Sequence, residues 1–385
     1  MIPYGRQNIT EDDINEVEKV LRSDFLTQGP LVPKFEQSIA SYCSASYSVA
    51  VNSATSALHI ACMALNLGPG DWLWTSPNTF VASANCALHC GAKVDFVDID
   101  PYTYNLSVDK LSIKLEKAEK LGKLPKIVIP VHYAGQSCDM SVIHKLSKKY
   151  GFKIIEDASH ALGGSYKNSK IGSCTFSDIT VFSFHPVKII TTAEGGMALT
   201  NNKEIADKIR RLRTHGITND KKIMSQRSSD EIWNYQQIEL GFNYRMNDIQ
   251  AALGLSQMKK LDDYVKLRHE IAKVYDDELK SLTIKLPFQA SETYSSYHLY
   301  PISILNLEKN NQKQIYLKLK ESDIGVNMHY IPIHRHPYYE SLGFKKNDFP
   351  QAEKFHREAI SISIYPFLLK KNQDYIIEKL KKLLI

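Results

Sequence analysis

The first three-fifths of the chain alternate short apolar runs with helical patterns. Runs rich in apolar and β-branched residues predict strands at 48–51, 72–75, 94–99, 126–131, 153–157 and 179–184. Apolar residues at helical spacing predict helices at 57–65, 83–89 and 141–150. Strands that alternate with helices are typical of an α/β fold, in which helices cover both faces of a mostly parallel sheet. Ligands of such folds bind beyond the carboxyl ends of the strands.

The pattern changes near Asp248, where one long, charged amphipathic helix is predicted over 249–275. A strand at 297–304 and helices at 311–322 and 373–384 follow, which together predict a smaller α+β unit. The length of 385 residues also exceeds that of one ordinary hydrophobic core. We therefore expect a large domain over 1–250 and a small C-terminal domain over 251–385.

Composition and charge exclude several classes of protein. The chain is 43% hydrophobic and 23% charged, which is typical of a globular protein. Its net charge of +6 is too dilute to indicate a nucleic-acid partner. Six cysteines fit reduced thiols better than a disulfide framework. Because no apolar run is long enough for a membrane helix and the N-terminus has no signal-peptide core, we expect a cytoplasmic enzyme without a membrane partner.

One lysine differs from the many on charged helix faces. Lys188 follows the strand predicted at 179–184 and has the apolar neighbours Val187 and Ile189. Desolvation lowers the pKa of a lysine and yields the neutral amine that attacks carbonyl groups. The alternative interpretation is an ordinary loop lysine whose ammonium group reaches solvent.

An acid and the lysine together match the needs of one cofactor. Asp157 ends the apolar strand predicted at 153–157, which would direct its carboxylate into a cleft. Pyridoxal phosphate requires a lysine that forms a Schiff base and an acid beside its pyridinium nitrogen. The alternative for Asp157 is a cap on the following helix.

A phosphate site and a stacking ring are also available. Thr55 and Ser56 lie at a strand-to-helix junction, where backbone N–H groups bind anions, although a plain helix cap explains them too. Ser183 could add a hydroxyl group, and Phe80 could stack on a cofactor or belong to the core. The chain has neither GxGxxG after its first strand nor GxxxxGK[ST], so Rossmann dehydrogenases and P-loop NTPases lose their usual support.

Because these features occur in the order phosphate site, ring, acid and lysine, the chain resembles the DegT/DnrJ/StrS family of sugar aminotransferases. These are fold-type I pyridoxal phosphate enzymes, and the resemblance covers essentially the whole chain. Its motifs are Leu26-Thr27-Gln28-Gly29-Pro30, Ala54-Thr55-Ser56-Ala57-Leu58, Glu156-Asp157-Ala158, Ser183-Phe184 with Lys188, Glu194-Gly195-Gly196, Gly241-Phe242-Asn243-Tyr244-Arg245-Met246 and Tyr330-Ile331-Pro332-Ile333-His334.

The resemblance implies a role for each matching residue. Lys188 would form the imine with the cofactor and move the proton, and Asp157 would hold the pyridinium proton. The other implied cofactor contacts are Thr55, Ser56 and Ser183 at the phosphate, Phe80 on the ring, His160 near the ring hydroxyl, and Asn243 at the phosphate of the neighbouring subunit. The last contact implies a homodimer with composite sites. Related dehydratases carry histidine in place of the lysine, so Lys188 favours transamination.

The resemblance also implies contacts with a nucleotide sugar. They are Tyr4, Arg6, Thr27, Gln28, Tyr330 and His334, for which N-terminal packing and a histidine-rich surface loop are the alternatives. Tyr4-Gly5-Arg6-Gln7, 23–30 and 185–188 resemble the pseudaminic acid branch of the family, although Ile189 and 362–366 depart from its pattern. That branch implies transfer of an amino group from glutamate to C4 of a UDP-linked 4-keto-6-deoxy-N-acetylhexosamine.

Two other functions stay open at this point. One is an aminotransferase for a different UDP-linked or dTDP-linked keto sugar, and the other is a non-catalytic sensor that binds pyridoxal phosphate. Under either enzyme interpretation, the positive net charge would favour the binding of an anionic cofactor and a nucleotide diphosphate in a cleft.

Cys86, His89 and Cys90 form the one pattern that suggests a metal. No matching pair lies at the spacing of a zinc site, and a helix interior explains both cysteines. We therefore predict that the protein has no metal site.

Overall fold

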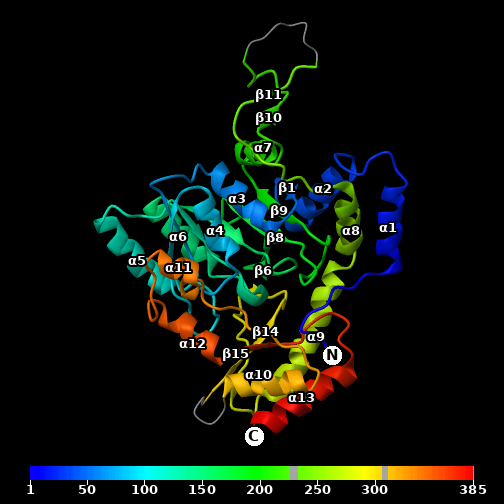
Figure 1. Ribbon diagram of the computed structural model, residues 1–385, viewed down its shortest axis with the longest axis vertical. Helices are drawn as coiled ribbons and strands as arrows, with labels where there is room; N and C mark the ends of the chain where they lie inside the picture. The colour runs from blue at the N-terminus through cyan, green and yellow to red at the C-terminus, as the bar shows by residue number, and fades with distance from the viewer. Residues whose placement is uncertain (226–232, 306–310, 385) are drawn as a thin grey trace.

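A seven-stranded sheet forms the centre of the protein, of which the computed structural model describes residues 1–225, 233–305 and 311–384 (Figure 1). The strands lie in the order β1-β9-β8-β5-β4-β2-β3. Six of them run parallel, whereas β9 is antiparallel to both of its neighbours. Their bounds are β1 Tyr47–Val51, β2 Trp72–Thr75, β3 Lys93–Phe96, β4 Ile127–Ile129, β5 Lys153–Asp157, β8 Ile179–Ser183 and β9 Gly196–Thr200. The prediction of a mostly parallel α/β sheet is confirmed, and β9 is the strand that the pattern did not predict.

Helices cover both faces of this sheet because side chains along each strand point alternately to opposite sides. On β5, Ile155 joins one hydrophobic cluster and Ile154 another. The first face is covered by α3 (Ala54–Ala64), α4 (Ala82–His89) and α7 (Lys203–Leu212). The second is covered by α2 (Leu31–Cys43), α5 (Val108–Lys120), α6 (Met140–Tyr150) and α8 (Asp248–Met258).

The long helix predicted over 249–275 is wrong, because the structure has two helices there. Helix α8 ends at Met258, and α9 runs over Leu261–Leu279. Between them, the ammonium group of Lys260 lies 2.8 Å from the buried carboxylate of Asp13 on α1 (Glu11–Leu21). This ion pair fixes the bend and holds α1 against α8.

The C-terminal part is a smaller α+β unit with its own core. Helices α9, α10 (Gln312–Glu321) and α13 (Lys370–Leu384) pack with strands β12 (Ile284–Lys285), β14 (Tyr300–Ile304) and β15 (Ala359–Ile362). The strand predicted from 297 thus begins at Tyr300. Ile2 pairs with Ile324 and packs on this core, so the first residues lie with the C-terminal part. The domain division at residue 250 stays a prediction.

Short elements complete the fold. They are the three-stranded sheet of β13 (Thr293–Tyr294), β6 (Ser165–Tyr166) and β7 (Ser169–Lys170), the helices α11 (Pro337–Ser341) and α12 (Pro350–Glu358), and the ribbon of β10 (Ile217–Thr218) and β11 (Gln236–Gln237). The β10–β11 ribbon projects from the body beyond α7 (Figure 1). Beside it, Tyr235, Ile238 and Leu240 expose large apolar side chains to solvent.

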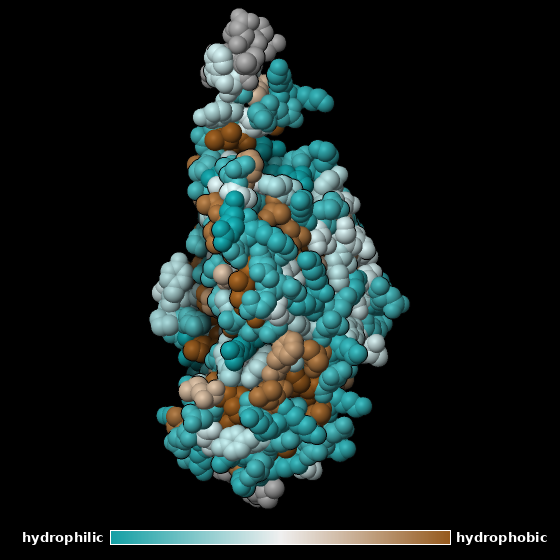
Figure 2. Space-filling view, turned by 90° about the vertical axis from the view of Figure 1, so that its right-hand side faces the viewer, coloured by the Kyte–Doolittle hydropathy of each residue, from teal (hydrophilic) through white to brown (hydrophobic). Residues whose placement is uncertain are grey.

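The side of the molecule that carries α1 is mainly hydrophilic, with hydrophobic residues gathered in separate patches (Figure 2). Within 1–225, 233–305 and 311–384, we found no helix with the length and apolar character needed to cross a bilayer.

Candidate active site

A cavity of about 590 Å³ opens beyond the carboxyl ends of the parallel strands. Asp157 is the last residue of β5 and Ser183 the last of β8, and both line this cavity. Its walls bring together eight residues that the sequence singled out: Tyr4, Thr55, Phe80, Asp157, His160, Ser183, Lys188 and Tyr330. Segments far apart in the chain therefore meet at one site.

Asp157 is held by two hydrogen bonds. The hydroxyl of Ser83, in the first turn of α4, donates to Oδ2 at 2.6 Å, and the backbone N–H of Ser159 donates to Oδ1 at 3.1 Å. Both Asp157 and Ser83 are buried. Each carboxylate oxygen of Asp157 thus accepts a hydrogen bond that fixes its position at the wall of the cavity.

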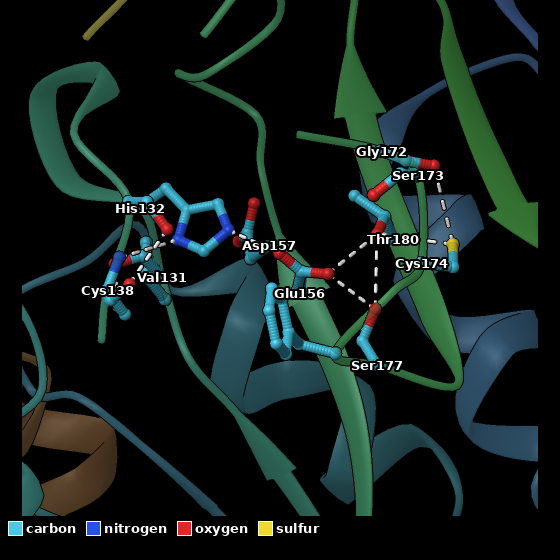
Figure 3. A network of polar contacts seen from close by, with 12 residues as sticks. Val131, His132, Cys138, Glu156, Asp157, Gly172, Ser173, Cys174, Ser177 and Thr180 are labelled. Atoms are coloured by element: carbon cyan, nitrogen blue, oxygen red, sulfur yellow. Dashed lines mark hydrogen bonds and ion pairs between the residues drawn. The ribbon is translucent and has the colours of Figure 1, made fainter. Parts of the chain in front are cut away.

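A network of polar contacts beside Asp157 anchors the end of β5 (Figure 3). The hydroxyls of Ser177 and Thr180 donate to Oε1 of the neighbouring Glu156, and Oε2 lies 2.7 Å from Nε2 of His132. Nδ1 of His132 accepts the backbone N–H of Cys138 at 3.1 Å, so the ring proton lies on Nε2 and points to Glu156.

The buried Glu156 carboxylate is consequently satisfied on both oxygens. Burial alone would raise the pKa of Glu156, but the hydrogen bonds from His132, Ser177 and Thr180 outweigh it and lower that pKa. Because successive residues of a strand point to opposite sides, anchoring Glu156 directs Asp157 into the cavity.

Lys188 lies on the connection between β8 and the antiparallel β9. The backbone N–H of Phe184 donates to the carbonyl of Gly195 at 2.9 Å, and that of Thr192 donates to the carbonyl of Phe184 at 3.0 Å, which closes this connection at its base. Burial lowers the pKa of Lys188 to about 8, while the negative charge of Asp157 acts in the opposite direction. Near neutral pH, the neutral share of this amine is therefore far larger than that of an exposed lysine.

A wall of uncharged imidazoles faces the lysine. Burial lowers the pKa values of His160 and His298 well below the ordinary range, and that of His329 to about 4, with the charge of Lys188 adding to each effect. His298 packs on His160 with ring centroids 4.4 Å apart, and its buried Nδ1 has no hydrogen-bond partner among the described residues. These neutral rings add no positive charge beside Lys188.

The hydroxyl of Tyr330 is oriented by His160. Nδ1 of His160 accepts the backbone N–H of Ala134 at 3.3 Å, which places the ring proton of the neutral imidazole on Nε2. Nε2 lies 3.1 Å from the Tyr330 oxygen and donates to it, so the tyrosine proton is free to point into the cavity. The site therefore offers a directed hydroxyl donor.

The opposite end of the cavity is the N-terminus of α3. Ser53 caps this helix by accepting the backbone N–H of Ser56 at 3.1 Å, and Ser53, Ala54 and Thr55 all line the cavity. A Cβ at Gly196 would lie 2.5 Å from the nitrogen of Ala54, so only glycine allows β9 to pass this close to the helix end. Free N–H groups and hydroxyls at a helix N-terminus form an anion site.

Several predicted residues lie elsewhere. Ser56 is buried behind the cavity, where its hydroxyl contacts that of Ser53 at 3.0 Å. His334 is fully buried with Nε2 2.9 Å from Glu353 and is not among the residues that line the cavity. Its burial contradicts the alternative of a surface loop, and the substrate contact stays a prediction. Arg6, Thr27, Gln28 and Asn243 are exposed and are not among the described residues that line the cavity of their own chain.

The structure also reveals site residues that the sequence did not indicate. Ser83 has no sequence signal, because its role depends on the packing of α4 against β5. Ser53 could have been found as the helix cap before Thr55. The others that line the cavity include Ser159, His185, His298, Asn327, Met328 and His329, whereas Glu194 was part of a motif but had no predicted role. Among the described parts of the chain, no three histidine, cysteine or acidic side chains are grouped as metal ligands.

The sequence profile of the DegT/DnrJ/EryC1/StrS aminotransferase family matches residues 7–381. The spore coat polysaccharide biosynthesis protein SpsC of Bacillus subtilis is 39% identical, over 99% of this chain and 96% of that protein. The UDP-4-amino-4,6-dideoxy-N-acetyl-beta-L-altrosamine transaminase of Campylobacter jejuni is 38% identical, over 99% of each chain.

Two solved structures are also similar. A Helicobacter pylori aminotransferase involved in the biosynthesis of pseudoaminic acid superposes with a TM-score of 0.90 at 32% identity, covering 100% of this chain and 99% of that one. A putative sugar aminotransferase of Streptococcus pneumoniae, in its pyridoxal phosphate form, gives a TM-score of 0.88 at 31% identity and covers 99% and 98%.

Proposed function

Because the chain belongs to the DegT/DnrJ/EryC1/StrS aminotransferase family of pyridoxal phosphate enzymes that aminate nucleotide sugars, we propose which sugar it serves. The proposed reaction moves an amino group from L-glutamate to C4 of a UDP-linked 4-keto-6-deoxy-N-acetylhexosamine in pseudaminic acid biosynthesis. The observation that carries it is the placement of Lys188, Asp157 and the start of α3 around one cavity. Two similarities support the choice of sugar: one protein is named as the transaminase of a UDP-linked amino sugar, and another is named for the biosynthesis of pseudoaminic acid.

The residues present fit pyridoxal phosphate. The helix end at Ser53 and Thr55 and the hydroxyl of Ser183 would hold its phosphate, Phe80 its ring face, and Asp157 its ring nitrogen. When bound, the cofactor supplies a carbonyl carbon that condenses with amines and a protonated ring that accepts electrons from the substrate carbon. Each chemical requirement of the group thus has a matching side chain.

The chain's own residues then do three things. Asp157, fixed by Ser83, would hold a proton on the ring nitrogen of the bound cofactor. Lys188, partly neutral near pH 7, is able to accept a proton at Nζ and return it to an adjacent carbon. Tyr330, oriented by His160, donates its hydroxyl proton to an oxygen in the cavity. Tyr4, which also lines the cavity, is the proposed sugar contact on the N-terminal side.

We also propose a homodimer with composite sites. The projecting β10–β11 ribbon exposes apolar side chains, and Asn243 lies exposed outside its own cavity. In a dimer, Asn243 would reach the cofactor phosphate of the partner, and the exposed Arg6, Thr27 and Gln28 would contact substrate only in such a shared site.

The dimer is tested by mixing two inactive variants, Lys188→Ala and Asn243→Ala. If sites are shared, subunit exchange creates mixed dimers with one intact site, which restores about a quarter of the wild-type activity under random pairing of a twofold dimer. A mixture that stays inactive while light scattering shows exchange would refute the composite site. Light scattering of the wild type alone tests the dimer.

The reaction is tested with the purified holoenzyme. Glutamate should bleach the absorbance of the cofactor, and a panel of UDP-linked and dTDP-linked keto sugars should then show which one gains an amine, by mass spectrometry and NMR. Lys188→Ala is the control that should do neither. Amination of another sugar would favour the alternative suggested by the similarity to SpsC. Absence of bleaching would favour a non-catalytic sensor.

The reaction is proposed to take place in the cytoplasm. All six cysteines are free, as expected where thiols are kept reduced.

A further inference from the structure

A buried carboxylate outside the cavity holds a distant part of the chain in place. Asp248 is the first residue of α8 and is fully buried. Its Oδ2 accepts the backbone N–H of Gly29 at 2.5 Å, and its Oδ1 accepts those of Leu31 at 3.0 Å and Val32 at 2.9 Å. In the other direction, the N–H of Asp248 donates to the carbonyl of Leu26 at 3.0 Å. One residue thus fixes both ends of the short loop that precedes α2.

The loop and the start of α2 depend on this carboxylate. The N-cap of α2 is Pro30, which gives the helix no side-chain hydrogen bond, so Asp248 accepts the free N–H groups of the first turn instead. Within the loop, Gln28 is in the left-handed region with a φ of 55°, and a Cβ at Gly29 would lie 2.5 Å from that of Phe25. A backbone of this shape persists only where its surroundings fix it. Asp248 supplies that constraint.

Helix α8 is itself held firmly against the body of the protein. The side-chain amide of Gln250, in its first turn, donates to the carbonyl of Glu194 at 2.9 Å, and Glu194 lines the cavity. Further along the helix, a Cβ at Gly254 would lie 2.6 Å from the ring of Phe35 on α2 and 2.9 Å from the methyl group of Thr192. Helix α8 therefore packs closely on α2, beside which it lies in Figure 1, and on the connection between β8 and β9.

We propose that Asp248 is a positioning residue for the nucleotide sugar. By fixing the loop before α2, it presents the exposed side chains of Thr27 and Gln28 in one arrangement to the substrate of the shared site. A hydroxyl and an amide both donate and accept hydrogen bonds, as the hydroxyl and carbonyl groups of a UDP-linked sugar require. The inference rests on the composite site proposed above and adds to it the residue that orders one of its parts.

Asp248→Asn tests this role because an amide has only one oxygen that accepts hydrogen bonds. Whichever way the amide turns, its NH2 group faces at least one backbone N–H of the loop or of α2, which then has no acceptor. The loop is no longer held in one arrangement, and binding of the nucleotide sugar must first order it. Glutamate has no nucleotide, so its reaction does not need the loop. The two half-reactions should therefore respond differently.

The experiment measures each half-reaction of the holoenzyme by the absorbance of the cofactor. Glutamate bleaches it, and UDP-linked keto sugars from the panel described above restore it. In Asp248→Asn, the second-order rate constant for the sugar should fall at least about tenfold, whereas the maximal rate at saturating sugar and the rate with glutamate should stay within about twofold. Asp139→Asn, which alters the N-cap of α6, should leave all three unchanged.

A double-mutant cycle shows whether Asp248 acts through the loop. In a protein that already carries Thr27→Ala and Gln28→Ala, Asp248→Asn should lower the rate constant for the sugar by no more than about twofold, because the side chains that it positions are gone. Hydrogen exchange guards against a variant that fails to fold. The backbone amides of 26–32 should exchange faster in the Asp248→Asn holoenzyme than in the wild type, whereas those of α6 should not.

Equal losses in the two half-reactions, additive losses in the cycle or unchanged exchange over 26–32 would each overturn the inference. A wild type that aminates none of the keto sugars would instead refute the proposed function, and the substrate role of the loop with it. The two failures are distinct, because the first appears only in the variants and the second already in the wild type.

Discussion

The reactivity of Lys188 toward electrophiles should follow the low pKa that the cavity gives it. With a pKa of about 8, about 9% of its amine is neutral at pH 7, against about 0.03% for a lysine with the ordinary pKa of 10.5. The neutral fraction is therefore about 300-fold larger. Since only the neutral amine attacks, the rate should rise about tenfold per pH unit up to pH 8 and level off above it.

The assay labels the cofactor-free protein with fluorodinitrobenzene from pH 6 to 10 and quantifies each lysine by peptide mass spectrometry. The exposed lysines of α6, such as Lys145 and Lys148, provide internal references in the same sample. The slow entry of reagent into the cavity changes the plateau rate of Lys188 but leaves its midpoint near pH 8.

A variant tests the physical cause. Asp157 favours the protonated form of Lys188, so Asp157→Asn should move the midpoint to lower pH. A wild-type labelling rate whose pH midpoint lies above pH 10 would refute the claim that desolvation lowers the pKa of Lys188. An upward shift in Asp157→Asn would refute the electrostatic coupling of the two residues.

Three further predictions concern the surroundings of the site. Tyr330→Phe should lower kcat/KM at least tenfold, because it loses a hydrogen bond worth about 1.5 kcal/mol to the reacting molecule. Tyr338→Phe at the surface should leave kcat/KM unchanged, and steady-state kinetics distinguishes the two variants. Gly196→Ala should weaken cofactor binding and destabilise the protein by about 1–3 kcal/mol through overpacking. Gly68→Ala, which has open space around it, should destabilise the protein less. Absorbance titration measures cofactor binding, and urea unfolding measures stability. Glu156→Gln should destabilise by about 3–5 kcal/mol at pH 7. Because the pKa of Glu156 is lowered on folding, its stabilisation is present above its unfolded pKa and is lost as pH falls through the folded one, so urea unfolding of the variant should depend less on acid pH.

The sheet could be predicted from the sequence because its parallel strands are buried on both faces and read as continuous apolar runs. The missing strand, β9, has the same character, but it begins at Gly196 directly after a loop of small residues, which hid its start. The bend between α8 and α9 depends on the ion pair of Lys260 with Asp13, far away in sequence. A periodic pattern contains no information about such a partner.

The same difference between local sequence patterns and contacts with distant residues explains which site residues could be predicted. Lys188, Asp157 and Thr55 could be predicted because each lies at or shortly after the end of a strand, and strand ends of a parallel sheet meet at one edge. Ser83 and His298 act through packing between elements, for which one sequence gives no sign. His334 has a plausible motif and yet is buried against Glu353, where the pair holds α12 and does not face the cavity.

The antiparallel turn into β9 has a kinetic consequence for the amine that it carries. A crossover helix would have placed Lys188 on a long and separately packed segment, but here both ends of its connection are hydrogen-bonded to each other at Phe184 and Gly195. The side chain of Lys188 therefore extends from a backbone segment whose two ends are fixed to each other. When its amine dissociates from a reaction partner, the amine remains beside that partner. The amine then recombines as an intramolecular reactant, with the high effective molarity that a fixed orientation confers. Release of the lysine is therefore readily reversed at every turnover.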